Sequence, residues 1–224
     1  MQDPHDPAFR LFQMAALVEG TVSDRKRRLF AVACLSRFEG RLQDPRSRRA
    51  LEVAWRYAAG LASEVERQIV EFDAYEAHQE LREARFGGDS LVPWTWQGDL
   101  LTRAAALVVS HGTYYAEDAA DYARRSLGAE AEPEEEATQL ALLGDILGPK
   151  GRPRIEPYWL AANDSAAVQL AQVIEEGSAF DLLPILADAL EDAGCDSAPL
   201  LEHCRRPAPH TRGCWVIDLI LGQA

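Results

Sequence analysis

The chain has 224 residues, 47% of them hydrophobic, and no uninterrupted apolar run reaches the length that spans a membrane. Such a chain has room for one large or two small domains. Its start lacks the basic and apolar stretches of a secretory signal, and its four cysteines lack the close spacing of a disulfide framework. We therefore predict a soluble, cytoplasmic protein that does not bind a membrane.

The net charge of −13 is unevenly distributed along the chain. Residues 1–60 carry 11 Arg plus Lys against 7 Asp plus Glu, a net charge of +4, and the remainder carries 12 against 29, a net charge of −17. A strongly acidic surface repels the phosphate backbone of nucleic acids. Nucleic-acid binding by the whole surface is thus disfavoured, although the basic early segment could act locally.

Apolar residues recur with the 3.6-residue period of a helix, and no segment shows the alternation of a strand. We predict an all-α fold, an irregular bundle of about ten helices without significant sheet. In the first half, helices are expected at about 7–18, 24–41, 63–86, 98–110, 114–127 and 133–147. A further helix is expected to begin at Asp44-Pro45. The apolar segment 91–96 should pack its two tryptophans beneath these helices.

Prolines at 149, 153 and 157 force an extended path and predict a connector over residues 149–157. Residues 1–148 then form an N-terminal helical bundle with a variable middle, and residues 158–224 form a C-terminal helical segment. We expect helices at about 165–176, 181–193, 197–204 and 210–221. We also expect the C-terminal segment to pack on the N-terminal helices as one globular unit.

An arginine-rich group in the early helices is the best sequence argument for an anionic ligand or an acidic partner. Guanidinium groups pair with phosphates and carboxylates in two-pronged geometry. Solvated or internally paired arginines are the simpler interpretation, because no glycine-rich loop or interleaved aromatic accompanies them. The candidate residues are Arg25, Lys26, Arg28, Arg46 and Arg49.

The last thirty residues concentrate cysteine and histidine, which are the usual ligands of zinc. The candidate ligands are Cys195, His203, His210 and Cys214, the last two of which would share a helix face if the final helix begins by residue 210. The spacing matches no compact zinc motif, and cysteines are common in protein cores. Core packing without a cofactor is therefore the leading interpretation, and a zinc site is the alternative.

Asp218 lies within an apolar stretch of the final predicted helix, which predicts that its carboxylate is buried. A buried carboxylate must be paired or hydrogen-bonded, because leaving it unpaired costs several kcal/mol. The expected partners are Arg212, one of the cations between residues 25 and 28, or backbone N–H groups at a helix start. We predict a structural role for Asp218 and Arg212.

Two segments at the ends of the chain have a distinctive sequence. They are Ser23-Asp-Arg-Lys-Arg-Arg-Leu-Phe-Ala-Val-Ala-Cys34 near the N-terminus, and His203-Cys-Arg with Pro209-His-Thr-Arg-Gly-Cys-Trp-Val-Ile-Asp-Leu-Ile-Leu-Gly222 near the C-terminus. These segments resemble signatures of an uncharacterised bacterial all-helical protein family. The resemblance implies no activity, because the family has none attached to it. It implies that the two ends pack together.

The sequence contains no dinucleotide fingerprint, phosphate loop, metalloprotease motif or nucleophile elbow. The leading hypothesis is therefore a non-catalytic helical adaptor that binds another protein. One alternative is a small-molecule or nucleotide-binding protein, with or without enzymatic activity, that uses the arginines together with Trp94, Trp96 or Trp159 around a pocket. The other alternative is a zinc-stabilised helical domain.

Overall fold

The computed structural model describes residues 22–111, 115–207 and 209–223. This part of the chain is all-α, as predicted, and contains eleven α-helices, three short 3-10 helices and no strand. The helix predicted at 7–18 lies outside the described residues. No described helix is long and apolar enough to cross a membrane. The α-helices are α2 (Asp24–Ser36), α3 (Pro45–Ala58), α4 (Glu64–Ala84), α5 (Trp96–Val108), α6 (Tyr115–Arg125), α7 (Glu132–Leu147), α8 (Pro157–Ala161), α9 (Ala166–Gly177), α10 (Leu183–Asp192), α11 (Ala198–Arg205) and α12 (Trp215–Leu221).

Several helices begin at the capping residues that the sequence indicates. Ser23 accepts a hydrogen bond from the backbone of Lys26 at the start of α2, and Ser63 accepts one from Glu66 at the start of α4. Asp44 caps α3, with proline at its first position. These side chains satisfy backbone N–H groups that have no partner inside the helix, which fixes where each helix starts.

The chain divides into two compact units, Met1–Leu140 and Ala141–Ala224. The division falls inside α7, so the last two turns of this helix belong to the C-terminal unit. Residues 148–156, over most of the predicted connector, are not helical, and the division between the two units lies before them. The reason is that α7 carries Asp145 and leads to Gly148, both of which contact C-terminal residues.

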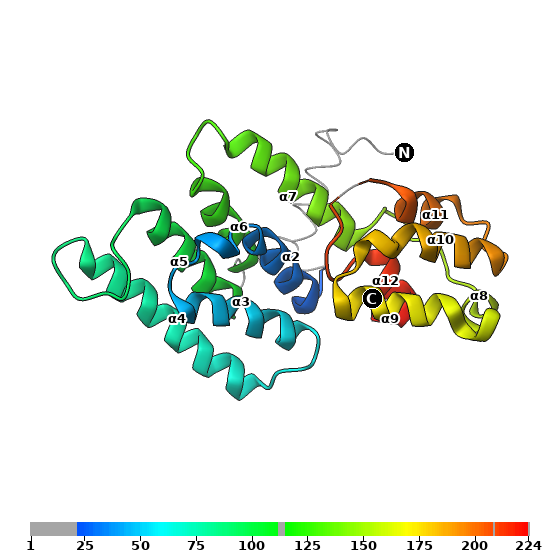
Figure 1. Ribbon diagram of the computed structural model, residues 1–224, viewed down its shortest axis with the longest axis horizontal. Coiled ribbons are helices and arrows are strands. Elements are labelled where there is room, and N and C mark those ends of the chain that lie inside the picture. Colours follow the sequence, from blue (N-terminus) through cyan, green and yellow to red (C-terminus); the bar gives the residue numbers. More distant parts are fainter. Residues whose placement is uncertain (1–21, 112–114, 208, 224) are drawn as a thin grey trace. The chain divides into compact units, whose positions relative to one another are not determined.

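Helices α2 to α6 build the N-terminal unit around one apolar core (Figure 1). Helix α5 lies against α3, α4 and α6, and α2 lies against α3 and α6. Small side chains at the contacts let the helices approach closely. The alanines concerned include Ala54, Ala74, Ala105, Ala116 and Ala119, all of which are fully buried.

Helices α9 to α12 and the short α8 form the C-terminal unit around a second core. Trp215 at the start of α12 is almost fully buried there. The backbone of Gly148 passes so close that a Cβ at this position would lie 2.6 Å from Cγ of Trp215. Gly148 also has a φ of +71°, which favours glycine. The end of α7 is thus fixed against the start of α12.

Two local predictions are wrong. The last helix begins at Trp215 rather than at residue 210, because Gly213 adopts a φ of +81° and Cys214 a non-helical backbone conformation with a ψ of 128°. His210 and Cys214 therefore lie in the loop before the helix and do not share a helix face. Trp96, expected to be packed beneath the helices, is 47% exposed at the start of α5.

Candidate metal centre

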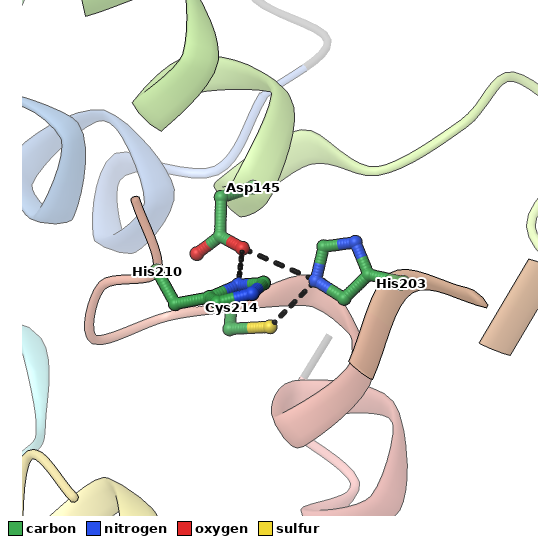
Figure 2. Close-up of side chains that lie close together, drawn as sticks. All are labelled: Asp145, His203, His210 and Cys214. Atoms are coloured by element: carbon green, nitrogen blue, oxygen red, sulfur yellow. Dashed lines mark hydrogen bonds and ion pairs between the residues drawn. The ribbon is translucent and has the colours of Figure 1, made fainter. Parts of the chain in front are cut away.

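Four side chains of the C-terminal unit converge on one point (Figure 2). Asp145 comes from the last turn of α7 and His203 from α11, while His210 and Cys214 come from the loop between α11 and α12. One potential ligand atom from each residue lies within 4.8 Å of the other three. These residue types are ligands of zinc, and a group of this composition could hold a metal ion.

Asp145 contacts both histidines of the group and is fully buried. Its Oδ1 lies 2.6 Å from Nδ1 of His210 and 3.1 Å from Nε2 of His203, and its Oδ2 accepts a hydrogen bond of 2.9 Å from the backbone of Thr211. Burial alone would raise the pKa of this carboxyl. The two histidines outweigh burial and lower the pKa, so the carboxylate form is favoured.

His210 presents Nδ1 to the centre of the group. Its other ring nitrogen, Nε2, lies 3.1 Å from the carbonyl oxygen of Arg206. Because a carbonyl only accepts hydrogen bonds, Nε2 carries a proton, and the contact between Nδ1 and the Asp145 carboxylate requires either a second proton or a cation between these two atoms. A backbone carbonyl that fixes the distant ring nitrogen in this way is the usual support for a metal-binding histidine.

His203 directs Nε2 toward both Asp145 and Cys214, with a distance of 3.2 Å to Sγ of the cysteine. Its Nδ1 accepts a hydrogen bond of 2.9 Å from the indole N–H of Trp215. The imidazole packs edge to face on both Trp215 and His210. Burial lowers the pKa of His203 and outweighs the opposing effect of Asp145, which favours the neutral ring.

Cys214 is fully buried, and burial together with the nearby Asp145 carboxylate raises the pKa of its thiol well above the usual range. The thiol form is therefore favoured when only protein groups surround it. A divalent cation reverses this preference, since a coordinating thiol loses its proton. The four side chains thus have the character of ligands whose charge a cation would balance.

Three of the four predicted ligands belong to this group, and one does not. Cys195 packs in the apolar core of the C-terminal unit instead. The fourth member, Asp145, was missed by sequence reasoning. Two signals could have identified it, because the residue lies among apolar neighbours and occupies the C-terminal turn of a helix, where the helix dipole disfavours a carboxylate.

The cations proposed as anion ligands are differently placed. Arg28 is fully buried and donates hydrogen bonds to the carbonyls of Val108 and Ser110 at the end of α5, at 2.6 and 3.1 Å. Its guanidinium also lies over the ring of Tyr115. Lys26 is 4% exposed. The charged groups of Arg28 and Lys26 are therefore not exposed to solvent.

Arg46, Arg49 and Arg25 lie nearer the surface. Arg46 is paired with both Asp44 and Glu80, at 3.0 and 2.5 Å, and these hydrogen-bonded carboxylates raise its pKa. Arg49 is exposed, and Arg25 is partly exposed. Internal pairing thus accounts for part of the basic group, and binding of an external anion by these residues stays a prediction.

Asp218 is fully buried in the first turn of α12. Arg212 is half-buried, and its guanidinium lies 3.4 Å from the backbone oxygen of Glu176. Burial lowers the pKa of Arg212. The partner proposed for Asp218 stays a prediction.

The predicted small-molecule site does not coincide with a described pocket. Two pockets of about 330 and 410 Å³ lie in the N-terminal unit. The residues that line these pockets include none of the five predicted cations. They also include neither Trp94 nor Trp96, the two tryptophans of this unit in the hypothesis. Trp159, the third named tryptophan, is buried in the core of the C-terminal unit.

Comparisons of the chain with protein-family models, with curated proteins and with solved structures found no match. The resemblance of its two ends to a bacterial helical family stays a prediction.

Proposed function

We propose that the C-terminal unit binds one zinc ion through Asp145, His203, His210 and Cys214, and that the ion stabilises the fold of this unit. The observation that carries the proposal is the convergence of four different zinc-ligating side chains within 4.8 Å. Zinc in proteins is held by four such donors at about 2.0–2.3 Å, so a tetrahedron of donors has edges of about 3–4 Å. The distances of 3.1 and 3.2 Å from Nε2 of His203 fall in this range, whereas the hydrogen bond of 2.6 Å between Asp145 and His210 is shorter.

The chemistry of the donors favours zinc over other divalent cations. A thiolate and two imidazoles are poor ligands for magnesium and calcium, which prefer oxygen donors. A mixed site of one carboxylate, two imidazoles and one thiolate has the borderline softness that zinc prefers. The two anionic ligands, the carboxylate of Asp145 and the thiolate of Cys214, would together balance the charge of the ion.

A structural role is supported by the number and the burial of the donors. Four protein ligands fill the coordination sphere of zinc, whereas catalytic sites keep one position for water or substrate. Asp145 and Cys214 are fully buried, and His203 is 8% exposed. The four residues come from α7, from α11 and from the loop between α11 and α12, so one ion would join three segments. This is the effect for which small helical units use zinc.

Metal binding through His203 requires a change in the tautomer of its imidazole ring. Its Nδ1 accepts the hydrogen bond from Trp215, which places the proton of the neutral ring on Nε2, the nitrogen that faces the other ligands. Coordination through Nε2 would move this proton to Nδ1, where it would meet the indole N–H. Zinc binding should therefore displace the Trp215 hydrogen bond and alter the fluorescence of this tryptophan.

The test is a titration of the purified full chain with cobalt, a spectroscopic substitute for zinc. We expect one equivalent of cobalt to produce the visible absorption of a tetrahedral site together with a thiolate-to-metal band. Zinc should then displace cobalt. In Cys214→Ser the thiolate band should vanish, whereas the matched variant Cys195→Ser, altered at a buried cysteine outside the group, should retain it.

Three results would overturn the proposal. The wild-type chain could show no saturable absorption, the spectrum could be octahedral without a thiolate band, or the Cys195→Ser variant could lose the band while Cys214→Ser keeps it. Asp145→Asn and His210→Gln add a check that does not depend on the thiolate band. Each should weaken binding at least tenfold while leaving the helical content of the chain in saturating zinc unchanged.

A further inference from the structure

A row of exposed apolar side chains runs along one face of α4 in the N-terminal unit. Val65, Ile69 and Phe72 are 65, 54 and 60% exposed, and Leu61 just before the helix is 61% exposed. The three helical residues are four and three positions apart, which places them on one face over two turns. We call these four residues the α4 stripe.

The α4 stripe lies opposite the face that holds the helix in the fold. Val70, Ala74, Ala77 and Leu81 are buried where α4 packs against α3 and α5 (Figure 1). The helix is therefore apolar on two opposite faces, whereas a surface helix ordinarily has only one apolar face. Contiguous exposed apolar side chains of this kind mark sites where proteins associate.

The charges around the α4 stripe restrict what can bind there. Over residues 64–76 the helix carries the acidic residues Glu64, Glu66, Glu71, Asp73 and Glu76 and a single cation, Arg67, which is 2% exposed. Within the described residues, Asp73 and Glu76 form neither an ion pair nor a side-chain hydrogen bond. Two carboxylates without a compensating charge thus lie beside Phe72. Asp73 is one residue further along the helix, and Glu76 is one turn further.

These charges disfavour a second copy of the chain as the occupant, because two α4 helices would bring acidic borders together in a chain that already has a net charge of −13. Anionic membranes and nucleic acids are disfavoured for the same reason. A cationic border with an apolar centre complements the α4 stripe. An amphipathic helix laid along an apolar surface is a common form of such recognition.

We propose that the α4 stripe is a docking surface for an amphipathic helix of another protein, with an apolar face flanked by lysine or arginine. The site lies in the N-terminal unit and is separate from the proposed zinc centre. It assigns the adaptor function suggested by the sequence to a particular surface. The apolar side chains supply affinity, while Asp73 and Glu76 select cationic partners and accelerate association.

The experiment uses the full chain and three synthetic peptides of about 20 residues, a length that gives several helical turns. The first peptide has a leucine stripe at helical spacing flanked by lysines, the second has glutamates in place of the lysines, and the third is a scrambled version of the lysine peptide. Binding is measured by calorimetry at two salt concentrations. We expect the lysine peptide to bind at least tenfold more tightly than the other two.

Variants of the chain test whether the lysine peptide binds at the α4 stripe. The double variant Ile69→Ser with Phe72→Ser should weaken binding of the lysine peptide at least tenfold. Asp73→Asn with Glu76→Asn should weaken it less and should reduce its salt dependence. The matched control, Val173→Ser with Ile185→Ser, removes two apolar side chains of similar exposure, 54 and 52%, from the C-terminal unit and should leave binding unchanged.

The docking proposal would be overturned by equal binding of the lysine and scrambled peptides, by equal binding of the lysine and glutamate peptides, or by no binding to the wild-type chain. It would also be overturned if the Ile69→Ser, Phe72→Ser variant bound like wild type. Sedimentation of the chain alone supplies a further outcome. A dimer that this variant dissociates would assign the stripe to self-association and reject the external helix.

Discussion

The two units of this protein bury polar side chains in opposite ways. In the N-terminal unit, the buried polar groups are guanidinium groups that donate hydrogen bonds to backbone carbonyls. Arg28 donates to Val108 and Arg67 to Val109, both at the end of α5. In the C-terminal unit, a carboxylate, two imidazoles and a thiol direct their potential ligand atoms at one another around a common point.

The difference shows how a buried polar group reveals its role. A cation that caps the carbonyls of a helix end is satisfied by protein atoms, and it also matches the negative end of the helix dipole. In the C-terminal group, hydrogen bonds join the four side chains, and a cation could take the place of the protons in these bonds. The terminal guanidinium nitrogens of the N-terminal unit thus have protein acceptors, although Nε of Arg28 has none, whereas the C-terminal group has the composition of a ligand set.

The largest expected effect comes from removing a thiolate from the C-terminal group. Cys214→Ala should lower zinc affinity at least a hundredfold and destabilise the C-terminal unit by several kcal/mol at saturating zinc, because ligand binding adds directly to folding stability. The matched variant Cys34→Ala changes a fully buried cysteine of the N-terminal unit. It should retain zinc affinity, as measured by competition with a chromophoric chelator, and a comparable loss would contradict the assignment.

Removing a buried guanidinium from the N-terminal unit should have the next largest effect. Arg28→Met leaves the carbonyls of Val108 and Ser110 without these donors and should reduce the free energy of unfolding by about 3 kcal/mol. Arg49→Met, at an exposed position, should cost less than about 0.5 kcal/mol. Urea unfolding measures both changes, and zinc content should be unchanged in both variants. Equal stability of Arg28→Met and wild type would show that the buried cation does not stabilise the fold.

His78 predicts a pH dependence in the N-terminal unit. Burial lowers its pKa from 6.5 to about 4, and the unfolded chain therefore binds the proton more readily than the folded chain. Stability should be complete above pH 6.5 and should fall as the pH is lowered toward 4, by up to about 2 kcal/mol at pH 5. His78→Asn should remove this part of the pH dependence in urea unfolding between pH 7 and 5. An unchanged pH profile in the variant would exclude His78 as its source.

Much of the fold can be predicted from sequence because the determinants are local. The helical period and the caps Ser23, Asp44 and Ser63 fix where helices occur, and each depends on residues within a few positions. The start of α12 was predicted wrongly because Gly213 interrupts a segment that is otherwise compatible with a helix.

The candidate site could be predicted only in part, since it depends on tertiary contacts. His203, His210 and Cys214 are close in sequence and were proposed together, but Asp145 lies nearly sixty residues before His203. The packing of the end of α7 against Trp215 and the hydrogen bond from the backbone of Thr211 hold its carboxylate near the other three. The burial of Arg28 likewise depends on the distant carbonyls of α5, so its sequence neighbours could not distinguish a capping role from an anion site.

Elemental analysis of the purified full chain tests the central claim most directly. The chain should be expressed in medium with added zinc, freed of weakly bound metal by gel filtration, and compared with Cys214→Ala and Cys34→Ala prepared in the same way. Our account predicts about one zinc ion per chain in the wild type and in Cys34→Ala, and almost none in Cys214→Ala. A folded wild-type chain without bound zinc, which also fails to take up zinc added after purification, would contradict it.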